Sequence, residues 1–273
     1  MRNILISFLL ILNFSCAKRC KNCNTTLVQS IKISGTKPNL IYGGYGKVIS
    51  VGDFLNHVRH SNNINETENP DFIGLGTTCA LGDEMTYNGN KITKIFADNH
   101  NKISQKTMHL DEFISFAQVS VFNAQNIQRF FLKSIVNSNK LNSQNVHEIN
   151  KNGIFKQIIS FVANLEGLKN EPENSYIIRI NAKAKYLKVR AVHSKIKETG
   201  GKIDILSHVV EEKNFSKETE IIFSGIITGT NDVEAKILQG LHLHCEYGHV
   251  LDLGDLEDVQ IELQKIDKKI ILY

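Results

Sequence analysis

The sequence predicts an α+β domain built from two small, mostly antiparallel sheets around a cleft, with helices on the outside. Two observations support this fold class. Several short segments alternate apolar and polar residues, as half-buried strands do, while other segments repeat apolar residues at helical spacing. The expected strands and helices also lack the regular alternation of a parallel βαβ sheet, so sheets and helices should occupy separate places.

The first residues have the pattern of a secretory signal peptide. Arg2 supplies a positive charge, Ile4–Leu12 is an almost unbroken apolar run, and small residues follow it. This run is too short to anchor the chain across a bilayer. We therefore expect residues 1–17 to direct export to a secreted or extracytoplasmic location. Cleavage either follows Ala17 or precedes Cys16, which would then carry a lipid.

Length and charge limit the classes of function. Residues 18–273 are enough for one sizeable core, and we expect a single domain with a helical insertion near residues 137–170. The net charge of +4 comes from Lys and Arg side chains that are scattered along the chain. No dense basic run is present, which argues against a nucleic acid as partner.

The cysteines agree with export. Apart from Cys16, the chain has Cys20, Cys23, Cys79 and Cys245, an even number that an oxidising compartment could join in two disulfides. Cys20 and Cys23 also have the C-x-x-C spacing of redox and zinc motifs. They follow the signal peptide in a polar stretch without strand or helix signals, which favours a structural disulfide or a flexible tail.

The first half of the chain predicts three strands and one helix. Leu27–Ser34 and Pro38–Gly46 have strand patterns, and Ser61–Pro70 is polar and Asn-rich, as in a loop. Phe113–Ser120 has the pattern of a buried strand. Apolar residues then recur at helical spacing, which predicts a helix over Val121–Ile135. These residues are Ala124, Ile127, Phe130, Phe131 and Ile135.

The second half predicts a loop, a helix and more strands. Asn137–Asn152 is polar and is expected to form a loop or an insertion. Phe155–Leu168 repeats apolar residues at helical spacing, and Tyr176–Ala182 has a clear strand pattern. Further short strands are expected within Lys202–Tyr273.

The most distinctive segment is Lys217–Ile227, an expected strand that carries Glu218 and Glu220 near its start. Side chains alternate between the two faces of a strand, so these carboxylates point the same way. Like charges on one face repel each other and add nothing to folding. The pair is therefore either a solvated strand end beside lysines or a site that stabilises positive charge during a reaction.

This segment resembles the active site of bacterial ADP-ribosylating toxin A subunits of the cholera and pertussis type, which use an Arg-Ser-Glu set. In that family the E-x-E pair precedes a short apolar stretch and a glycine, as Glu218 and Glu220 precede Gly225. Phe113–Ala117 is similar to the family's aromatic-apolar-Ser-Thr-Ser strand. Tyr176–Ala182 is similar to the Tyr-rich strand that comes before the glutamates.

The resemblance covers most of Leu40–Val233 and implies an NAD cleft between the two sheets. Glu220 would stabilise the oxocarbenium character that develops on the ribose as nicotinamide leaves. Ser115 would hydrogen-bond Glu220 and fix its rotamer. Glu218 would orient or deprotonate the guanidinium of the acceptor protein.

One departure from the family divides the functional prediction. Tyr42 and Gly43 match the strand end at which the family's arginine grips the NAD phosphates, and Gly43 takes the place of that arginine. The first alternative is an exported mono-ADP-ribosyltransferase with NAD as substrate, a target protein of unknown identity and a delivery subunit. The second is an exported binding or surface protein of the same fold without NAD turnover. Either would meet a membrane only through its signal peptide or a lipid on Cys16.

A second cluster lies near the C-terminus. His242 and His244 share one face of an expected strand, and His249 can return to them after a turn at Gly248. These residue types suit a zinc or copper site. Cys245 can belong to a disulfide, and no other residue is evident that would orient the ligands. A surface strand without a metal is therefore favoured.

Overall fold

The computed structural model describes residues 29–33, 49–65, 68–78, 83–124, 126–136, 153–166, 175–192, 208–228, 241–266 and 268–272. Four predictions lie outside these residues: the signal peptide 1–17, the disulfides or flexible tail of Cys20, Cys23 and Cys79, the strand Pro38–Gly46 with Tyr42 and Gly43, and the loop Asn137–Asn152. The export, partner and domain predictions that depend on them stay predictions.

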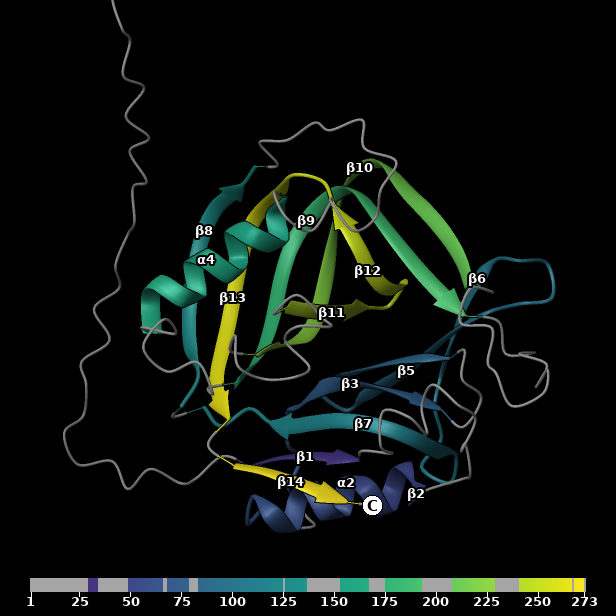
Figure 1. Ribbon diagram of the computed structural model, residues 1–273, viewed down its shortest axis with the longest axis vertical. Helices are drawn as coiled ribbons and strands as arrows, with labels where there is room; N and C mark the ends of the chain where they lie inside the picture. The colour runs from purple at the N-terminus through teal and green to yellow at the C-terminus, as the bar shows by residue number, and fades with distance from the viewer. Residues whose placement is uncertain are drawn as a thin grey trace, which may run out of the picture.

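Two sheets form the molecule, one above the other in Figure 1. The lower one, sheet A, has eight strands in the order β14-β1-β7-β3-β4-β5-β6, with β2 paired to β7. All its described pairings are antiparallel except that of β1 with β14. Its strands are β1 (Gln29–Ile33), β2 (Ile49–Ser50), β3 (Phe72–Thr78), β4 (Glu84–Asn88), β5 (Lys91–Ala97), β6 (Ile103–Thr107), β7 (Phe113–Val121) and β14 (Lys268–Leu272).

The upper layer, sheet B, has six strands in the order β10-β11-β12-β9-β13-β8, all paired antiparallel. The long strand β10 also pairs with β9, so β9, β10, β11 and β12 form a closed ring of pairings. The strands are β8 (Gln128–Ile135), β9 (Ser175–Val192), β10 (His208–Thr228), β11 (Leu241–Cys245), β12 (Gly248–Leu253) and β13 (Leu256–Ile266).

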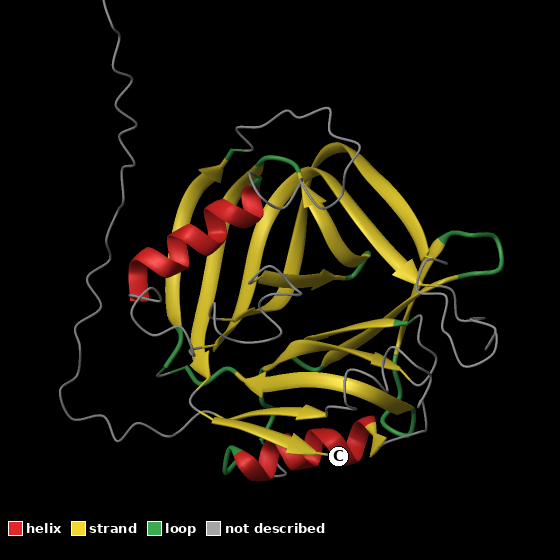
Figure 2. Cartoon of the chain, viewed as in Figure 1, coloured by secondary structure: helices red, strands yellow, loops and turns green. Residues whose placement is uncertain are grey.

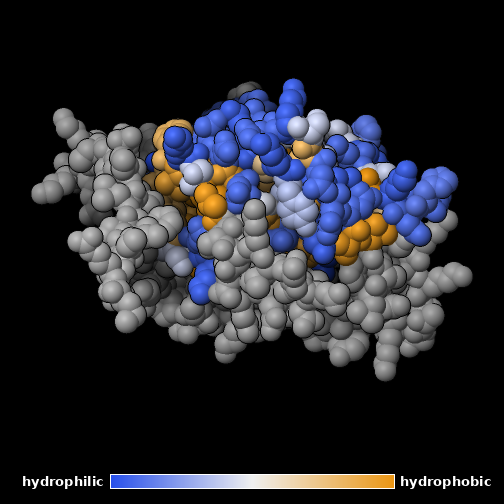
Figure 3. All heavy atoms as spheres, turned by 90° about the horizontal axis from the view of Figure 1, so that it is seen from above, coloured by the Kyte–Doolittle hydropathy of each residue, from blue (hydrophilic) through white to orange (hydrophobic). Residues whose placement is uncertain are grey.

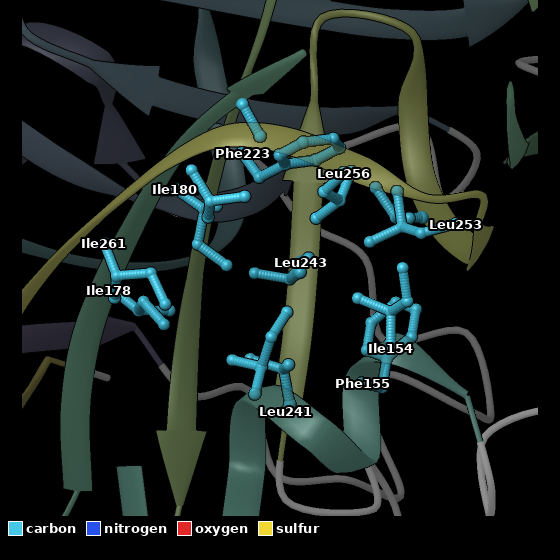
Figure 4. Close-up of a cluster of buried hydrophobic side chains, with 14 of the residues drawn as sticks. Ile154, Phe155, Ile178, Ile180, Phe223, Leu241, Leu243, Leu253, Leu256 and Ile261 are labelled. Atoms are coloured by element: carbon cyan, nitrogen blue, oxygen red, sulfur yellow. The ribbon is translucent and has the colours of Figure 1, made fainter. Parts of the chain in front are cut away.

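The main core lies on the inner face of sheet B, where helix α4 (Ile154–Glu166) closes it. Alternation along β9 sends Ile178 and Ile180 inward, and Phe223 and Leu243 come from β10 and β11. Figure 4 shows these side chains meeting Ile154 and Phe155 at the start of α4. The other face of sheet B faces sheet A and carries both polar residues and a small apolar cluster, in which Ile177 and Ile266 meet Ile73 of sheet A.

Helix α2 (Val51–Ser61) covers the other side of sheet A, below the strands in Figure 2. It begins at Ser50, whose Oγ accepts a hydrogen bond from the backbone N–H of Asp53 at 3.1 Å. Its apolar stripe, which includes Phe54 and Val58, packs into a second core cluster. Both helices thus lie outside the space between the two sheets.

Several predicted elements are confirmed, and two predictions are wrong. Strands are present at Phe113–Val121 and Ser175–Val192, and a helix at Ile154–Glu166, where they were expected. The predicted helix Val121–Ile135 is wrong, because its second half is strand β8 paired with β13. The α+β class is also wrong, because the described chain is mostly β with two helices.

None of the described helices is long and apolar enough to cross a bilayer. Seen from above, the described face is mainly hydrophilic, with smaller hydrophobic groups between the polar ones (Figure 3).

Candidate metal centre

The hairpin β11–β12 brings three histidines together. His244 pairs with His249 across the hairpin, and Cys245 pairs with Gly248 beside the turn. Gly248 has φ +140°, and a Cβ at this position would lie 2.6 Å from the backbone oxygen of Arg190. Glycine is therefore needed here both for the backbone conformation and for the close approach of β12 to β9.

The three imidazoles converge on one point. Nε2 of His242 lies 2.9 Å from Nδ1 of His249 and 2.9 Å from Nε2 of His244. One ligand nitrogen from each of the three rings lies within 4.8 Å of the others. Three nitrogen ligands at such spacing are what a zinc ion uses in a catalytic site, where the fourth position stays open.

The proton positions favour a shared cation. Nδ1 of His244 lies 2.8 Å from the carbonyl oxygen of Met85, which can only accept, so this nitrogen carries a proton. Nε2 of a neutral His244 therefore presents a lone pair to His242. One proton on Nε2 of His242 cannot serve both of its nitrogen contacts equally, whereas a cation between the rings would satisfy all three lone pairs.

The electrostatic environment keeps the rings neutral. Burial lowers the pKa of His242 and His249 well below the ordinary histidine value, and the neighbouring histidines and Arg190 lower it further. Burial also lowers the pKa of His244, although the charge of Glu84 acts in the opposite direction. Neutral imidazole is the form that binds metals.

Strand β4 of sheet A completes the site from the opposite side. Its Met85 carbonyl accepts the hydrogen bond from His244, which fixes the orientation of that ring. The preceding residue, Glu84, places Oε2 3.5 Å from Nε2 of His244, and this side chain is almost fully buried. A carboxylate from sheet A therefore lies beside the nitrogens that sheet B supplies.

A cation lies on the other flank of the histidines. Arg190 on β9 is the cross-strand neighbour of His249, so both side chains project from the same face of sheet B. Its Nε is buried and has no hydrogen-bond partner among the described residues. A buried guanidinium N–H without a partner is costly, and an anionic ligand at the site would satisfy it.

The centre belongs to a polar row that crosses the whole of sheet B. Beyond His244, the row continues through Ser224 to Arg179, whose guanidinium pairs with Asp71, just before β3 of sheet A, and, at 3.1 Å, with Glu262. The ion pair with Asp71 is a second contact between the two sheets, in addition to the one between His244 and Met85. In strand order the row is Arg129, Glu262, Arg179, Ser224, His244, His249 and Arg190.

The residues predicted for NAD chemistry lie elsewhere. Glu220 is exposed on β10 opposite Lys183, and Glu218 pairs with Lys185 at 2.9 Å. Ser115 lies on β7 of sheet A and not on a strand next to the glutamates, which are in sheet B. Tyr42 and Gly43 are outside the described residues. The described residues therefore do not bring the predicted set together.

The histidine pattern was found in the sequence, but its meaning was misjudged. The shared face of His242 and His244 and the return of His249 are confirmed. The favoured surface strand is wrong, because His244 is 1% exposed. Cys245 is a free, buried thiol rather than half of a disulfide. The sequence did not indicate Glu84, at the start of β4, as a site residue. It also did not indicate Arg190 on β9.

Comparison with known proteins identifies a fold. The sequence matches no family model and no curated protein. Among solved structures, acetolactate decarboxylase from Bacillus subtilis subspecies spizizenii is 14% identical, with a TM-score of 0.60, and 89% of each chain is covered. Alpha-acetolactate decarboxylase from Bacillus subtilis strain 168 is 16% identical, with a TM-score of 0.59 over 89% of this chain and 88% of that one.

A third similar structure is a protein of unknown function from Staphylococcus aureus, described as similar to alpha-acetolactate decarboxylase. It is 16% identical, with a TM-score of 0.57 over 89% of this chain and 88% of that one. At these identities the likeness establishes an acetolactate decarboxylase-like fold. It overturns the resemblance to ADP-ribosylating toxins, and with it the NAD cleft, the NAD-dependent transferase and the degenerate transferase-fold protein. The E-x-E segment misled because a pair of glutamates on a strand is also compatible with a solvated surface strand, which is what Glu218 and Glu220 occupy here.

Proposed function

We propose that this protein is a metal-dependent decarboxylase of small 2-hydroxy-3-oxo acids such as acetolactate. The observation that carries the proposal is the convergence of His242, His244 and His249 between Glu84 and Arg190. The fold supports it, because two solved structures of that fold are acetolactate decarboxylases. Because those likenesses establish the fold alone, the argument for activity rests on the site.

The residues fit a divalent metal. The three histidines would hold the ion through Nε2 of His242, Nε2 of His244 and Nδ1 of His249, with Glu84 near enough to join them. Such an ion supplies Lewis acidity toward the ketone oxygen of the substrate. The carbonyl of Met85 holds His244 in the tautomer that leaves Nε2 free.

The reaction is balanced without an oxidant or reductant. The bond between C1 and C2 of the acid breaks, carbon dioxide leaves, and the electron pair moves toward the C3 carbonyl. Uptake of one proton at C2 then gives a 2-hydroxy ketone. A site for this reaction must hold the carboxylate, polarise the ketone and deliver one proton.

Arg190 and Glu84 match the remaining two tasks. The guanidinium of Arg190 would bind the carboxylate, since its Nε has no other partner among the described residues. Glu84 would carry the proton to C2, because its carboxylate lies on the sheet A side of the histidines. Glu84 and His244 are buried, which limits the access of water from the side of sheet A.

The test is decarboxylation of acetolactate by the purified full-length protein. The protein is freed of metal with a chelator, loaded with Zn²⁺, Mn²⁺ or Co²⁺ in turn, and assayed for carbon dioxide and the hydroxy ketone. We expect turnover that depends on the added metal and disappears in His242→Ala. A loaded protein that binds metal tightly but releases no carbon dioxide would overturn the proposed reaction and leave a metal-binding protein.

A further inference from the structure

The site has a closed side and an open side, which the exposures along the polar row reveal. Ser224 is 0% exposed and His244 1% exposed, whereas His249 and Arg190 are half-buried. The next residue in the row is Val210 on β10, which is the cross-strand neighbour of Arg190 and is 40% exposed. Along this row, the exposed end of the site lies on the side of Arg190 and Val210.

We propose that Val210 is a specificity-determining residue that contacts the alkyl substituent on C2 of the substrate. This inference rests on the proposed decarboxylase function. A carboxylate bound to Arg190 and a ketone at the histidines place C2 between them. The alkyl group on C2 can then point along the row, toward the residue beyond Arg190. That residue is Val210, which is apolar and lies next to Arg190 on the same face.

The neighbouring charges favour an uncharged substituent. Lys188 and Glu212 form an ion pair at 3.5 Å. They are the next cross-strand pair after Arg190 and Val210 on the same face of β9 and β10. The charge of Lys188 is therefore already balanced by a carboxylate that is more than half exposed. A second carboxylate on the substrate would meet Glu212 and Val210 rather than a free cation. The class selected is a monocarboxylate with a short alkyl group on C2.

The test compares acetolactate, which has a methyl group on C2, with its 2-ethyl homologue. One additional buried CH₂ contributes about fourfold in kcat/KM, which corresponds to about 0.8 kcal/mol. We expect the zinc-loaded wild-type protein to favour the ethyl homologue by about this factor. In Val210→Thr, which keeps the shape but adds a hydroxyl, the ratio should fall to about one.

A matched control is available at the far end of sheet B. Val136, which follows β8, is 55% exposed, and β9 and β13 lie between β10 and β8 in the sheet, so Val136→Thr should keep the wild-type ratio. An unchanged ratio in Val210→Thr, or a wild-type ratio near one, would make Val210 an ordinary exposed strand residue.

A binding measurement separates this inference from the reaction itself. Calorimetry on the zinc-loaded protein compares 2-hydroxy-2-methylpropanoate with 2-hydroxy-2-methylbutanoate, which lack the ketone and cannot lose carbon dioxide by this route. Tighter binding of the longer acid, lost in Val210→Thr, would support the contact even if acetolactate is not turned over. Equal affinities in wild type, or no binding of either acid, would overturn it.

Discussion

Removal of the one imidazole that lies close to both others should weaken metal binding without unfolding the protein. His242→Ala is the informative change, because Nε2 of His242 lies 2.9 Å from a nitrogen of each partner ring. His242 is half-buried and bonds only these rings among the described contacts. By contrast, loss of His244 would leave the Met85 carbonyl without its buried donor, at a cost of about 1–3 kcal/mol in stability.

The expected magnitude follows from the number of ligands. Structural zinc sites with four ligands bind with an apparent free energy of about 10–16 kcal/mol, or about 3 kcal/mol for each ligand. Each 1.4 kcal/mol is a factor of about ten in an equilibrium constant. The dissociation constant for Zn²⁺ should thus rise roughly a hundredfold in His242→Ala.

Competition with a chromophoric chelator measures this constant, and the thermal midpoint with and without Zn²⁺ provides a second readout. His57→Ala is the control, since His57 is exposed on α2, on the far side of sheet A. Zn²⁺ should raise the midpoint of wild type and of this control by more than that of His242→Ala, because a hundredfold higher dissociation constant removes about 2.7 kcal/mol of the stabilisation by excess Zn²⁺. Equal zinc affinity in all three proteins would refute the assignment of the histidines as a metal centre.

Four further changes probe the site and its support. Arg190→Gln should lower kcat/KM about tenfold to a hundredfold through loss of a charged hydrogen bond while zinc affinity stays unchanged, and an unaltered kcat/KM would exclude carboxylate binding there. Glu84→Gln should lower kcat on the order of a hundredfold at nearly constant substrate affinity; steady-state kinetics that show only a KM effect would contradict a proton-carrying role. Gly248→Ala should lower the free energy of unfolding by about 1–3 kcal/mol and weaken zinc binding, as measured in urea and by chelator competition, and wild-type values in both would show that β12 has room for a Cβ. Ser50→Ala should cost about 1 kcal/mol in urea unfolding without a change in turnover, and any loss of turnover would mean that α2 influences the site.

The local pattern of apolar residues was sufficient to predict a helix or strand wherever that element buries a single face. Helix α4 and strand β9 were predicted because their apolar residues keep a single period over many positions. The segment that contains β8 misled because Ile127, Phe130 and Phe131 also fit helical spacing. In the folded chain Phe130 packs against the core while Phe131 is 69% exposed, which is the alternation of a strand.

The site could be predicted only in part, because its surroundings come from distant segments. The spacing of His242, His244 and His249 correctly implied a shared face. What buries them is β4, and Met85 is 159 residues away from His244 along the chain. Nothing in the local sequence of the hairpin indicates that a carboxylate and a carbonyl from that strand will cover it, so a buried histidine cluster resembled an exposed strand.

The same separation has a consequence for the order in which the chain folds. His242 and His249 are only seven residues apart, so the loop that joins them closes at little entropic cost, whereas the pairing of His244 with Met85 closes a loop of 159 residues. The hairpin can thus gather its imidazoles long before sheet A arrives, and a bound ion would hold that hairpin together while the slower long-range contacts form.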